Sequence, residues 1–413
     1  MDSALFEQIL DEASFLWFQR CNASTSEFYD LSTLIQLDRR LAGLFRLLPS
    51  SSKLAEPANQ IYDIEDPDKF YCTLIASASL KEINLTKLIS AATEAEAPET
   101  EIITALAWIE YPIISSTLYK LWESKQPNLQ HIAIEAWRLH RTRPDIDLTS
   151  CINHPDSKVS CSAIRLIGEL CLNDYYQATA DKLASKDYIQ RFWASYSCAL
   201  MGDVKGISNL IESLTDKHQT SSSEKETATN TGFATAQVAQ ATSWINHLTA
   251  CEALPQYIIK CFEVLGHTKF IPWLIGLTQK NHTSPYASHA FCTITGMALH
   301  SEEHGNIVPI LADDTALDNE EYEELWQQLP YSGFNEWWTE NKEKFDNDKR
   351  YFSGKEINQN NMQFIWHKGN QKQRERAAIE LALATPSTPL YEHTIPGFRQ
   401  HSFEPQKPQL QAT

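Results

Sequence analysis

The sequence predicts an all-α protein built as an array of stacked helical hairpins. Apolar residues recur at helical spacing along nearly all of the 413 residues, whereas glycine is scarce, at 13 residues, and alternating β-branched residues are rare. Three successive segments also repeat one pattern at a spacing of about 30 residues, the length of one helical hairpin. Because the chain is longer than a usual single core, two or more domains or an extended array are expected.

The repeated pattern has three parts. A polar turn opens each segment, an apolar helix follows, and an aspartate closes it. The segments are 127–145, 155–174 and 185–203, with alanine at matched places (Ala133, Ala163 and Ala194). One hairpin cannot bury its own apolar face, so neighbouring hairpins are expected to bury it together. Further units are predicted within 100–122, 256–278 and 284–296, and an irregular helical bundle is the alternative.

The segment 157–171, SKVSCSAIRLIGELC, is apolar around most of its circumference. Such a helix is typical of a buried position between neighbours. Part of its surface carries only small side chains or none, at Ser160, Ser162 and Gly168, which lets other helices approach closely. We therefore predict an inner helix that is pressed on both sides by equivalent helices.

The remaining segments complete the predicted organisation. Residues 216–232 hold no bulky apolar side chain and are rich in Ser, Thr, Glu and Lys, which is typical of a mobile loop. The predicted parts are an N-terminal helical region (1–75), HEAT-like repeats (76–215), a polar flexible loop (216–235), HEAT-like repeats (236–310), an acidic, Trp-containing segment with terminal helices (311–390) and a tail (391–413) whose last residues fray.

The amino-acid composition disfavours several classes of function. The chain has 35 basic and 53 acidic residues and a formal charge of −18, which disfavours a general nucleic-acid binder. An acidic surface suits a basic protein partner, although it also serves solubility. The nine cysteines form no CxxC pair, and the acidic N-terminus is unlike a signal peptide. We expect a cytoplasmic protein that neither spans nor binds a membrane.

The sequence gives only weak indications of a catalytic or metal-binding site. The sequence HSEEH at 300–304 fits the H-x-x-E-H zinc pattern, which requires the middle of a rigid helix. Gly305 and Asn306 follow at once, as at the end of a helix, so a polar helix end or loop is preferred. Asp38, Arg39 and Arg40 are interpreted as a salt-bridged helix face, and Gly296 as the end of a helix. No catalytic, metal-binding or cofactor-binding residues are predicted.

Two clusters are candidates for binding a partner. One is basic, with Lys372, Arg374 and Arg376, and suits an acidic partner or a phosphate. Pairing with the acidic run at 313–324 inside the protein is the alternative. The other cluster is Trp326, Trp337 and Trp338, for which core packing is the alternative.

Motifs along nearly the whole chain resemble a bacterial family of HEAT-repeat proteins of unknown function found beside type VI secretion genes. The stretches that carry the resemblance are 11–45, ALAW (105–108), GEL (168–170), 191–203, PWLIGL (272–277), 290–299, LP and WW within 329–338, RYFSG (350–354), 371–383 and FRQ (398–400). Each is short, but their order and spacing agree. His289 stands where the family pattern has Glu, and LPYSG (329–333) replaces an LPWPD-like turn.

The resemblance implies a context rather than a set of catalytic residues. Family members resemble accessory proteins encoded near spike, PAAR-like and adaptor genes. It therefore implies a non-enzymatic adaptor or chaperone for an effector or its PAAR-like carrier, which would capture a basic partner on the concave face of the array. An immunity protein that neutralises a toxin is the alternative. An enzyme such as a HEAT-like DNA glycosylase or bilin lyase remains a third hypothesis.

Overall fold

The computed structural model confirms the all-α class over the part of the chain that it describes. Described are residues 3–50, 67–80, 83–215, 220–251, 253–280, 282–298, 300–301, 305–306 and 331–400. The chain divides into two compact units. Unit 1 comprises Met1–Met201, Trp366–Ala378 and Thr385–Thr413, and unit 2 comprises Gly202–Ile365 and Ile379–Ala384.

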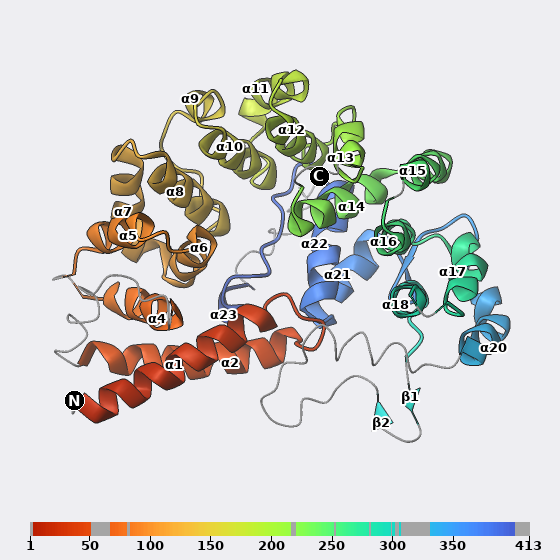
Figure 1. The fold of residues 1–413 in the computed structure, drawn as a ribbon, viewed down its shortest axis with the longest axis horizontal. Helices are drawn as coiled ribbons and strands as arrows, with labels where there is room; N and C mark the ends of the chain where they lie inside the picture. The colour runs from red at the N-terminus through yellow and green to blue at the C-terminus, as the bar shows by residue number, and fades with distance from the viewer. Residues whose placement is uncertain are drawn as a thin grey trace, which may run out of the picture. The chain divides into compact units, whose positions relative to one another are not determined.

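Unit 1 starts with an antiparallel pair of helices and continues as alternating helices (Figure 1). The elements are α1 (Ser3–Ala23), α2 (Leu31–Leu47), η1 (Leu48–Ser50), α4 (Pro67–Ser77), α5 (Leu85–Glu94), α6 (Glu99–Trp108), α7 (Tyr111–Glu123), α8 (Pro127–Leu139), α9 (Leu148–Ile152), α10 (Ser157–Glu169), η3 (Asn173–Tyr175), α11 (Tyr176–Ala180), η4 (Asp181–Ala184), α12 (Tyr188–Leu200) and α23 (Gly397–Gln400). Helices α21 (Gln359–Lys368) and α22 (Gln371–Ala384) give residues to both units.

The alternating helices form two rows. Helices α4, α6, α8, α10 and α12 pack side by side, and Figure 1 shows them on the inner side of the unit. Helices α5, α7, α9 and α11 lie on the outer side (Figure 1). As predicted, α10 packs between two equivalent helices, α8 and α12. The matched alanines Ala133, Ala163 and Ala194 are all fully buried in this row.

Two hydrogen bonds join α8 and α10 at the same separation in sequence. His131 Nδ1 lies 2.7 Å from Ser162 Oγ, and Arg138 Nη1 donates to Glu169 Oε2 at 2.7 Å. Each pair joins residues 31 positions apart. Polar side chains of α8 therefore bind side chains of α10 at nearly the spacing of the repeats.

Local sequence explains where these helices begin and end. Asp156 and Asp187 accept hydrogen bonds from the first N–H groups of α10 and α12. Helices α8 and α10 are followed by left-handed residues, Arg141 (φ 50°) and Cys171 (φ 53°). The N–H groups of the next residues, Thr142 and Leu172, bond back to the last turn in the Schellman pattern, which usually takes glycine at the left-handed position.

The burial of His140, at the end of α8, should make the stability of the protein depend on pH. Burial lowers the pKa of His140 from 6.5 to about 4, and its Nε2 lies 3.0 Å from the carbonyl oxygen of Leu106. Because the native state disfavours the protonated ring, stability should be full above pH 6.5 and fall as the pH drops toward 4. In His140→Phe this fall should be shallower, although His131, His267 and His393 also have lowered pKa values.

The measurement is the urea midpoint of both proteins between pH 7.5 and 4.5. The variant should lose less stability across this interval than the unmodified protein. An equal loss in the two proteins would show that His140 does not contribute to the pH dependence.

Unit 2 continues the helical pattern. Its elements are α13 (Ile207–Ser213), α14 (Ser222–Thr235), α15 (Val238–Ala250), α16 (Pro255–Leu265), η5 (Thr268–Phe270), α17 (Ile271–Leu277), α18 (Ser284–Thr295), β1 (His300–Ser301), β2 (Gly305–Asn306), α20 (Tyr331–Asn341), η6 (Lys342–Lys344), β3 (Tyr351–Phe352) and β4 (Lys355–Glu356). Helices α14, α16 and α18 pack in sequence, while α15 packs on α16 and α17 on α18. Ile259, Leu274, Phe291 and Phe334 lie in the core between these helices.

The hairpin β3–β4 closes the end of α18 in unit 2. Gly296 ends α18 in the left-handed conformation (φ 70°), which confirms the predicted helix end. The N–H groups of Ser353 and Gly354 donate to the carbonyls of Thr293 and Ile294, in the last turn of α18. A side chain at Gly296 would collide with the backbone at Gly354, so this approach requires glycine.

Arg350, just before the hairpin, binds the ends of two further helices. Its guanidinium donates to the carbonyls of Ala234 (2.8 Å), Leu265 (2.9 Å) and Val264 (3.1 Å), at the ends of α14 and α16. It also pairs with the buried carboxylate of Glu380 at 2.7 Å. A cation is favourable at these positions because the last carbonyls of a helix carry partial negative charge.

The predicted flexible loop over 216–235 is wrong for its described part. Residues 222–235 form α14, which starts with a capping box between Ser221 and Glu224. Ala228 and Phe233 are fully buried, and the Thr229 hydroxyl bonds to the carbonyl of Lys225 along the helix. Small polar side chains are thus tolerated inside a helix that packs against α13 and α16.

The predicted tail over 391–413 is wrong for residues 391–400, which pack against unit 1; residues 401–413 lie outside the described part. The division of the chain falls at 201/202 rather than at 216–235. The predicted segment 311–390 does not form a part of its own, since its described residues are shared between the two units. The acidic run at 313–324 lies outside the described residues.

Three further expectations concern sites and environment. Of the HSEEH stretch the structure describes His300 and Ser301, which form strand β1 and pair with Asn306 and Gly305 of β2 rather than lying in a helix. The nine cysteines, all within the described residues, form no disulfide, and Cys72, Cys151, Cys161, Cys198 and Cys261 are buried. Within the described ranges, no helix combines the length and apolar character needed to cross a bilayer.

Candidate functional site

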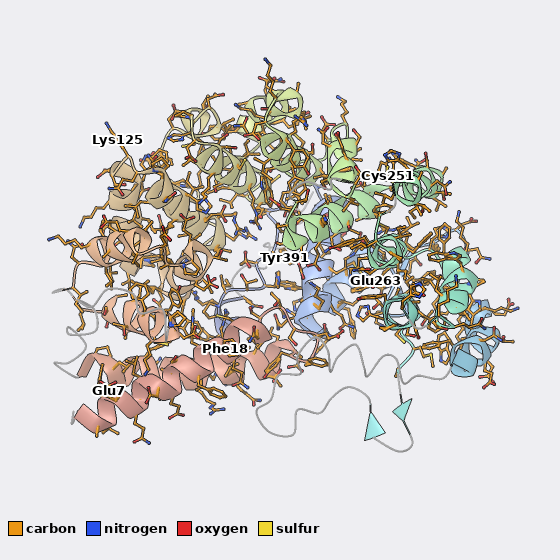
Figure 2. The ribbon with its side chains drawn as sticks, viewed as in Figure 1. Glu7, Phe18, Lys125, Cys251, Glu263 and Tyr391 are labelled. Atoms are coloured by element: carbon orange, nitrogen blue, oxygen red, sulfur yellow. The ribbon has the colours of Figure 1, made fainter. Side chains whose placement is uncertain are left out.

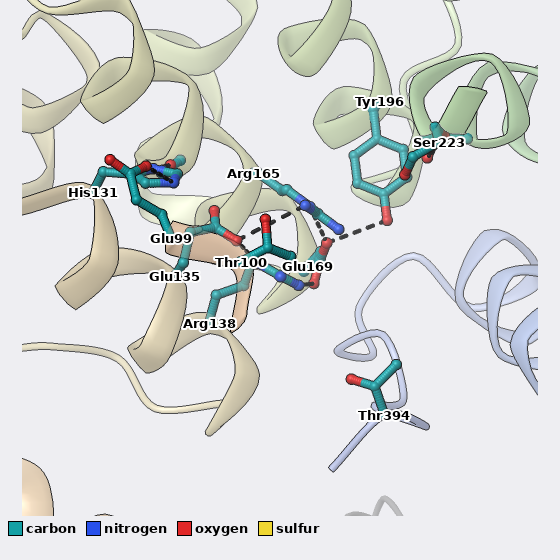
Figure 3. Close-up of polar contacts among 12 residues, drawn as sticks. Glu99, Thr100, His131, Glu135, Arg138, Arg165, Glu169, Tyr196, Ser223 and Thr394 are labelled. Carbon is teal, nitrogen blue, oxygen red and sulfur yellow. Dashed lines mark hydrogen bonds and ion pairs between the residues drawn. The ribbon is translucent and has the colours of Figure 1, made fainter. Parts of the chain in front are cut away.

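A cluster of charged side chains lies on the inner row of unit 1. We call Glu135, Arg138, Arg141, Arg165 and Glu169 the inner polar cluster. Arg138 bridges Glu135 (2.8 Å) and Glu169 (2.7 Å), and Arg165 Nε donates to the other oxygen of Glu169 at 2.7 Å (Figure 3). Arg141 Nη1 contacts Glu169 Oε2 at 2.5 Å. The cluster joins α8, the turn after it and α10.

Electrostatics keep the buried carboxylates of the cluster ionised. Burial by itself would raise the pKa of Glu169, but Arg138, Arg165 and Arg141 together hold this pKa well below 4.5. The same carboxylate accepts a long hydrogen bond from the Tyr196 hydroxyl of α12 at 3.5 Å (Figure 3). Glu169 therefore links α8, α10 and α12 through one side chain.

An extended segment of the same unit contacts the inner polar cluster. We call residues 385–400 the C-terminal strap. The strap meets the ends of α8 and α10 through three contacts: the Cys171 thiol donates to the carbonyl of Pro386 at 2.6 Å, the Leu390 N–H donates to the carbonyl of Glu169 at 2.8 Å, and Glu392 pairs with Arg141 at 3.0 Å. Two of these contacts use the strap backbone.

The far end of the strap is held by the first helices of the unit. Arg20 of α1 donates to the carbonyl of Thr394 and pairs with Asp38 of α2, at 2.5 Å and 3.2 Å. The Gly397 N–H donates to the other oxygen of Asp38 at 2.5 Å. Asp38 forms an ion pair, as the interpretation of a salt-bridged helix face expects, but it is fully buried, whereas Arg39 and Arg40 are exposed.

Two short motifs far apart in the sequence meet at this end. Arg399 donates to the carbonyls of Ala107 and Ile109, and Phe398 lies edge-on to Trp108, with ring centroids 6.1 Å apart. FRQ (398–400) thus packs on ALAW (105–108). Tyr391, labelled in Figure 2, stacks against Trp366 with ring centroids 4.9 Å apart.

A second polar group nearby has the residue types of an acyl-transfer site. His131 lies 2.7 Å from the Ser162 hydroxyl and 3.6 Å from Glu99. Ser162 is buried in the middle of α10, where the backbone N–H groups bond along the helix. Acyl transfer requires free N–H donors beside the nucleophile, so this arrangement is suited to joining α6, α8 and α10.

The unusual His289 of the sequence has a defined partner in unit 2. Its Nδ1 lies 3.0 Å from Glu263, which also pairs with Lys260. Although burial would raise the pKa of Glu263, Lys260 and His289 together lower it far below 4.5. A second Glu at position 289 would face the Glu263 carboxylate, so histidine is the compatible residue.

The predicted tryptophan cluster is used at least partly for packing. Trp337 and Trp338 of α20 are half-buried and contact Phe345, at ring centroid distances of 6.4 Å and 5.5 Å. Trp337 also lies edge-on to Phe291 of α18. Trp326 lies outside the described residues. A partner-binding role for the two described tryptophans stays a prediction.

The predicted basic cluster is not an accessible patch. Arg374 is fully buried, stacks 4.1 Å from the ring centroid of Trp366 and donates to Gln400. Arg376 is buried as well, and Lys372 pairs with Glu375 at 3.0 Å. Helix α22 turns Arg374 and Arg376 inward, so they do not form an exposed basic patch, and a role for them in partner contact stays a prediction.

Among the residues that hold the strap, only Asp38 was a candidate from the sequence. Arg138 and Glu169 lie 31 residues apart, close to the spacing of the repeats, and this spacing could have indicated their contact. Arg20, Arg141 and Glu392 carry no such signal, because their partners lie far away in the sequence.

Comparison with known proteins adds no assignment. No family model, curated protein or solved structure matches this chain. Among the described residues, no three His, Cys, Asp or Glu side chains are grouped as a metal site requires.

Proposed function

We propose that this protein is a non-enzymatic, HEAT-like α-solenoid that binds a protein partner in the bacterial cytoplasm. We further propose an association with type VI secretion, as an adaptor or chaperone for an effector or its PAAR-like carrier. The secretion context is carried by the motif resemblance. The binding role is supported by one observation in the structure.

That observation is the strap itself. Unit 1 holds the strap through its backbone: the end of α10 binds Pro386 and Leu390, while Arg20 of α1 and Asp38 of α2 bind Thr394 and Gly397. Recognition of backbone groups along an extended segment is the means by which many scaffolds bind partners. Stacked helical repeats characteristically present such surfaces on one side.

The charge of the inner polar cluster bears on the expected capture of a basic partner. Glu135 and Glu169 are both paired with arginines, so the acidic surplus of the chain does not lie on the inner polar cluster. Capture of a basic partner by acidic attraction is therefore not supported at this place.

The test is affinity purification of the tagged protein from its native host, with mass spectrometry of the co-eluting proteins and the tag alone as control. Recovery of an effector together with its spike or PAAR-like carrier supports a loading adaptor. Recovery of a toxin domain alone, in a stoichiometric complex, supports immunity instead, which rescue of cells from that toxin would establish. Recovery of neither contradicts the secretion link.

A further inference from the structure

The charge balance of the inner polar cluster depends on the strap. Three arginines, Arg138, Arg141 and Arg165, face only two glutamates, Glu135 and Glu169. Glu392 of the strap supplies the third carboxylate. Burial would raise the pKa of Glu392, but Arg141 and its neighbours lower it, so the strap carboxylate is held ionised. Any other occupant of this surface must also bring a carboxylate, because an unpaired buried guanidinium is costly.

The residues that hold the strap are conformationally strained. Arg141 and Cys171 both adopt the left-handed conformation, at positions that usually take glycine. Their side chains reach the strap at Glu392 and Pro386. Strain of this kind is concentrated at binding and switch sites. Glycine would relieve it, but only at the loss of these two contacts.

Several polar atoms in and around the strap also lack a hydrogen-bond partner. Four buried groups retain polar atoms without a hydrogen-bond partner: Arg141 Nε, His393 Nε2, Arg399 Nε, and Nε and Nη1 of Arg374. Arg374 donates one hydrogen bond to the neutral amide oxygen of Gln400 rather than to a carboxylate. Unpaired buried donors weaken the strap as a ligand, and an acidic side chain would pair them better.

We propose that the surface under the strap is a binding site for an extended acidic segment of the partner protein, and that the strap is an internal ligand which this segment displaces. The inference rests on the proposed binding function and names the chemistry of the partner. The partner segment places a carboxylate on Arg141, follows the inner ends of α8 and α10 with its backbone, and reaches toward Arg374.

The experiment tests whether the strap can be displaced from the folded protein, so the chain is cut before the strap only after the protein has folded. A protease recognition sequence is inserted between Ala384 and Thr385, and the purified full-length protein is then cut. A labelled synthetic peptide of residues 385–400 is added in excess, and its incorporation is followed by fluorescence anisotropy and native mass spectrometry. The cut fragment should leave and the peptide should replace it, while circular dichroism shows that the helices remain.

Matched peptides test the acidic chemistry. Glu392→Gln removes the only carboxylate within residues 385–400 and should weaken binding at least tenfold, whereas Ser387→Ala, at an exposed position, should bind like the parent peptide. In protein carrying Arg141→Gln, the Glu and Gln peptides should bind alike, because the coupled partner is gone. Equal binding of both peptides to the unmodified surface would refute the requirement for a carboxylate.

A second measurement uses the unmodified protein. Hydrogen exchange should show that the amides of Leu390 and Gly397 open more often than those of α8 and α10. If they open only with the whole unit, or if the cut fragment leaves only on unfolding, the strap is a permanent structural element and the inference fails. Such a failure would leave the proposed function intact, since the affinity purification can still recover a partner.

Discussion

Replacing Arg350 with alanine should destabilise unit 2 by about 3–5 kcal/mol, the range for removing one partner of a buried ion pair. The variant would leave the carbonyls of Ala234, Val264 and Leu265 without this donor. It would also leave the buried Glu380 carboxylate without its arginine. The measurement is chemical unfolding followed by circular dichroism, together with amide exchange of α14 and α16.

Lys349→Ala is the matched control, at the neighbouring position. Lys349 forms an exposed ion pair with Glu356 at 2.8 Å, and exposed pairs contribute little to stability because water screens them. We therefore expect at most a small change in the free energy of unfolding. Equal effects of the two substitutions would show that Arg350 does not hold the helix ends.

Replacing Gly168 with alanine should destabilise unit 1 by about 3 kcal/mol, at the upper end of the range for overpacking. A methyl group at Gly168 would lie 2.5 Å from the Cα atom of Ser197, so α10 and α12 would have to separate. The neighbouring Glu169 would be moved away from Tyr196, with which it is hydrogen-bonded. The change is measured by chemical unfolding.

Gly43→Ala supplies the control with the opposite expected sign. Gly43 lies within α2, and no atom beyond its own helix and chain neighbours would come within 4 Å of an added methyl group. Alanine is favoured over glycine in a helix by about 1 kcal/mol. Ser197→Gly should rescue Gly168→Ala only in part, because the Cα atom of Ser197 remains in the way. Complete rescue would contradict backbone contact as the cause.

The helices of unit 1 could be predicted from the sequence because their signals are local. Apolar periodicity and capping residues such as Asp156 and Asp187 lie within a few positions of the structure that they determine. The small residues of α10 predicted a close neighbour, and α12 is that neighbour at Gly168. The capping box of α14 was equally local, at Ser221 and Glu224, but the polar composition of 216–232 outweighed it.

The partners of charged residues could not be predicted in the same way. Arg374 occupies a segment that is basic and polar in sequence, and its burial depends on Trp366 and Gln400. Residues 391–400 of the strap were predicted to belong to a C-terminal tail. The order of the strap comes from residues hundreds of positions away, such as Arg20 and Asp38.

The sequence by itself determined the helical class, the buried character of α10 and several helix ends, since each depends on neighbours within one or two turns of the chain. Only the tertiary structure decided which charges are buried, that the ALAW and FRQ motifs meet, and that the strap completes the inner polar cluster. A buried charge is stable only beside its counter-charge, and that position is set by the packing of whole helices rather than by local sequence.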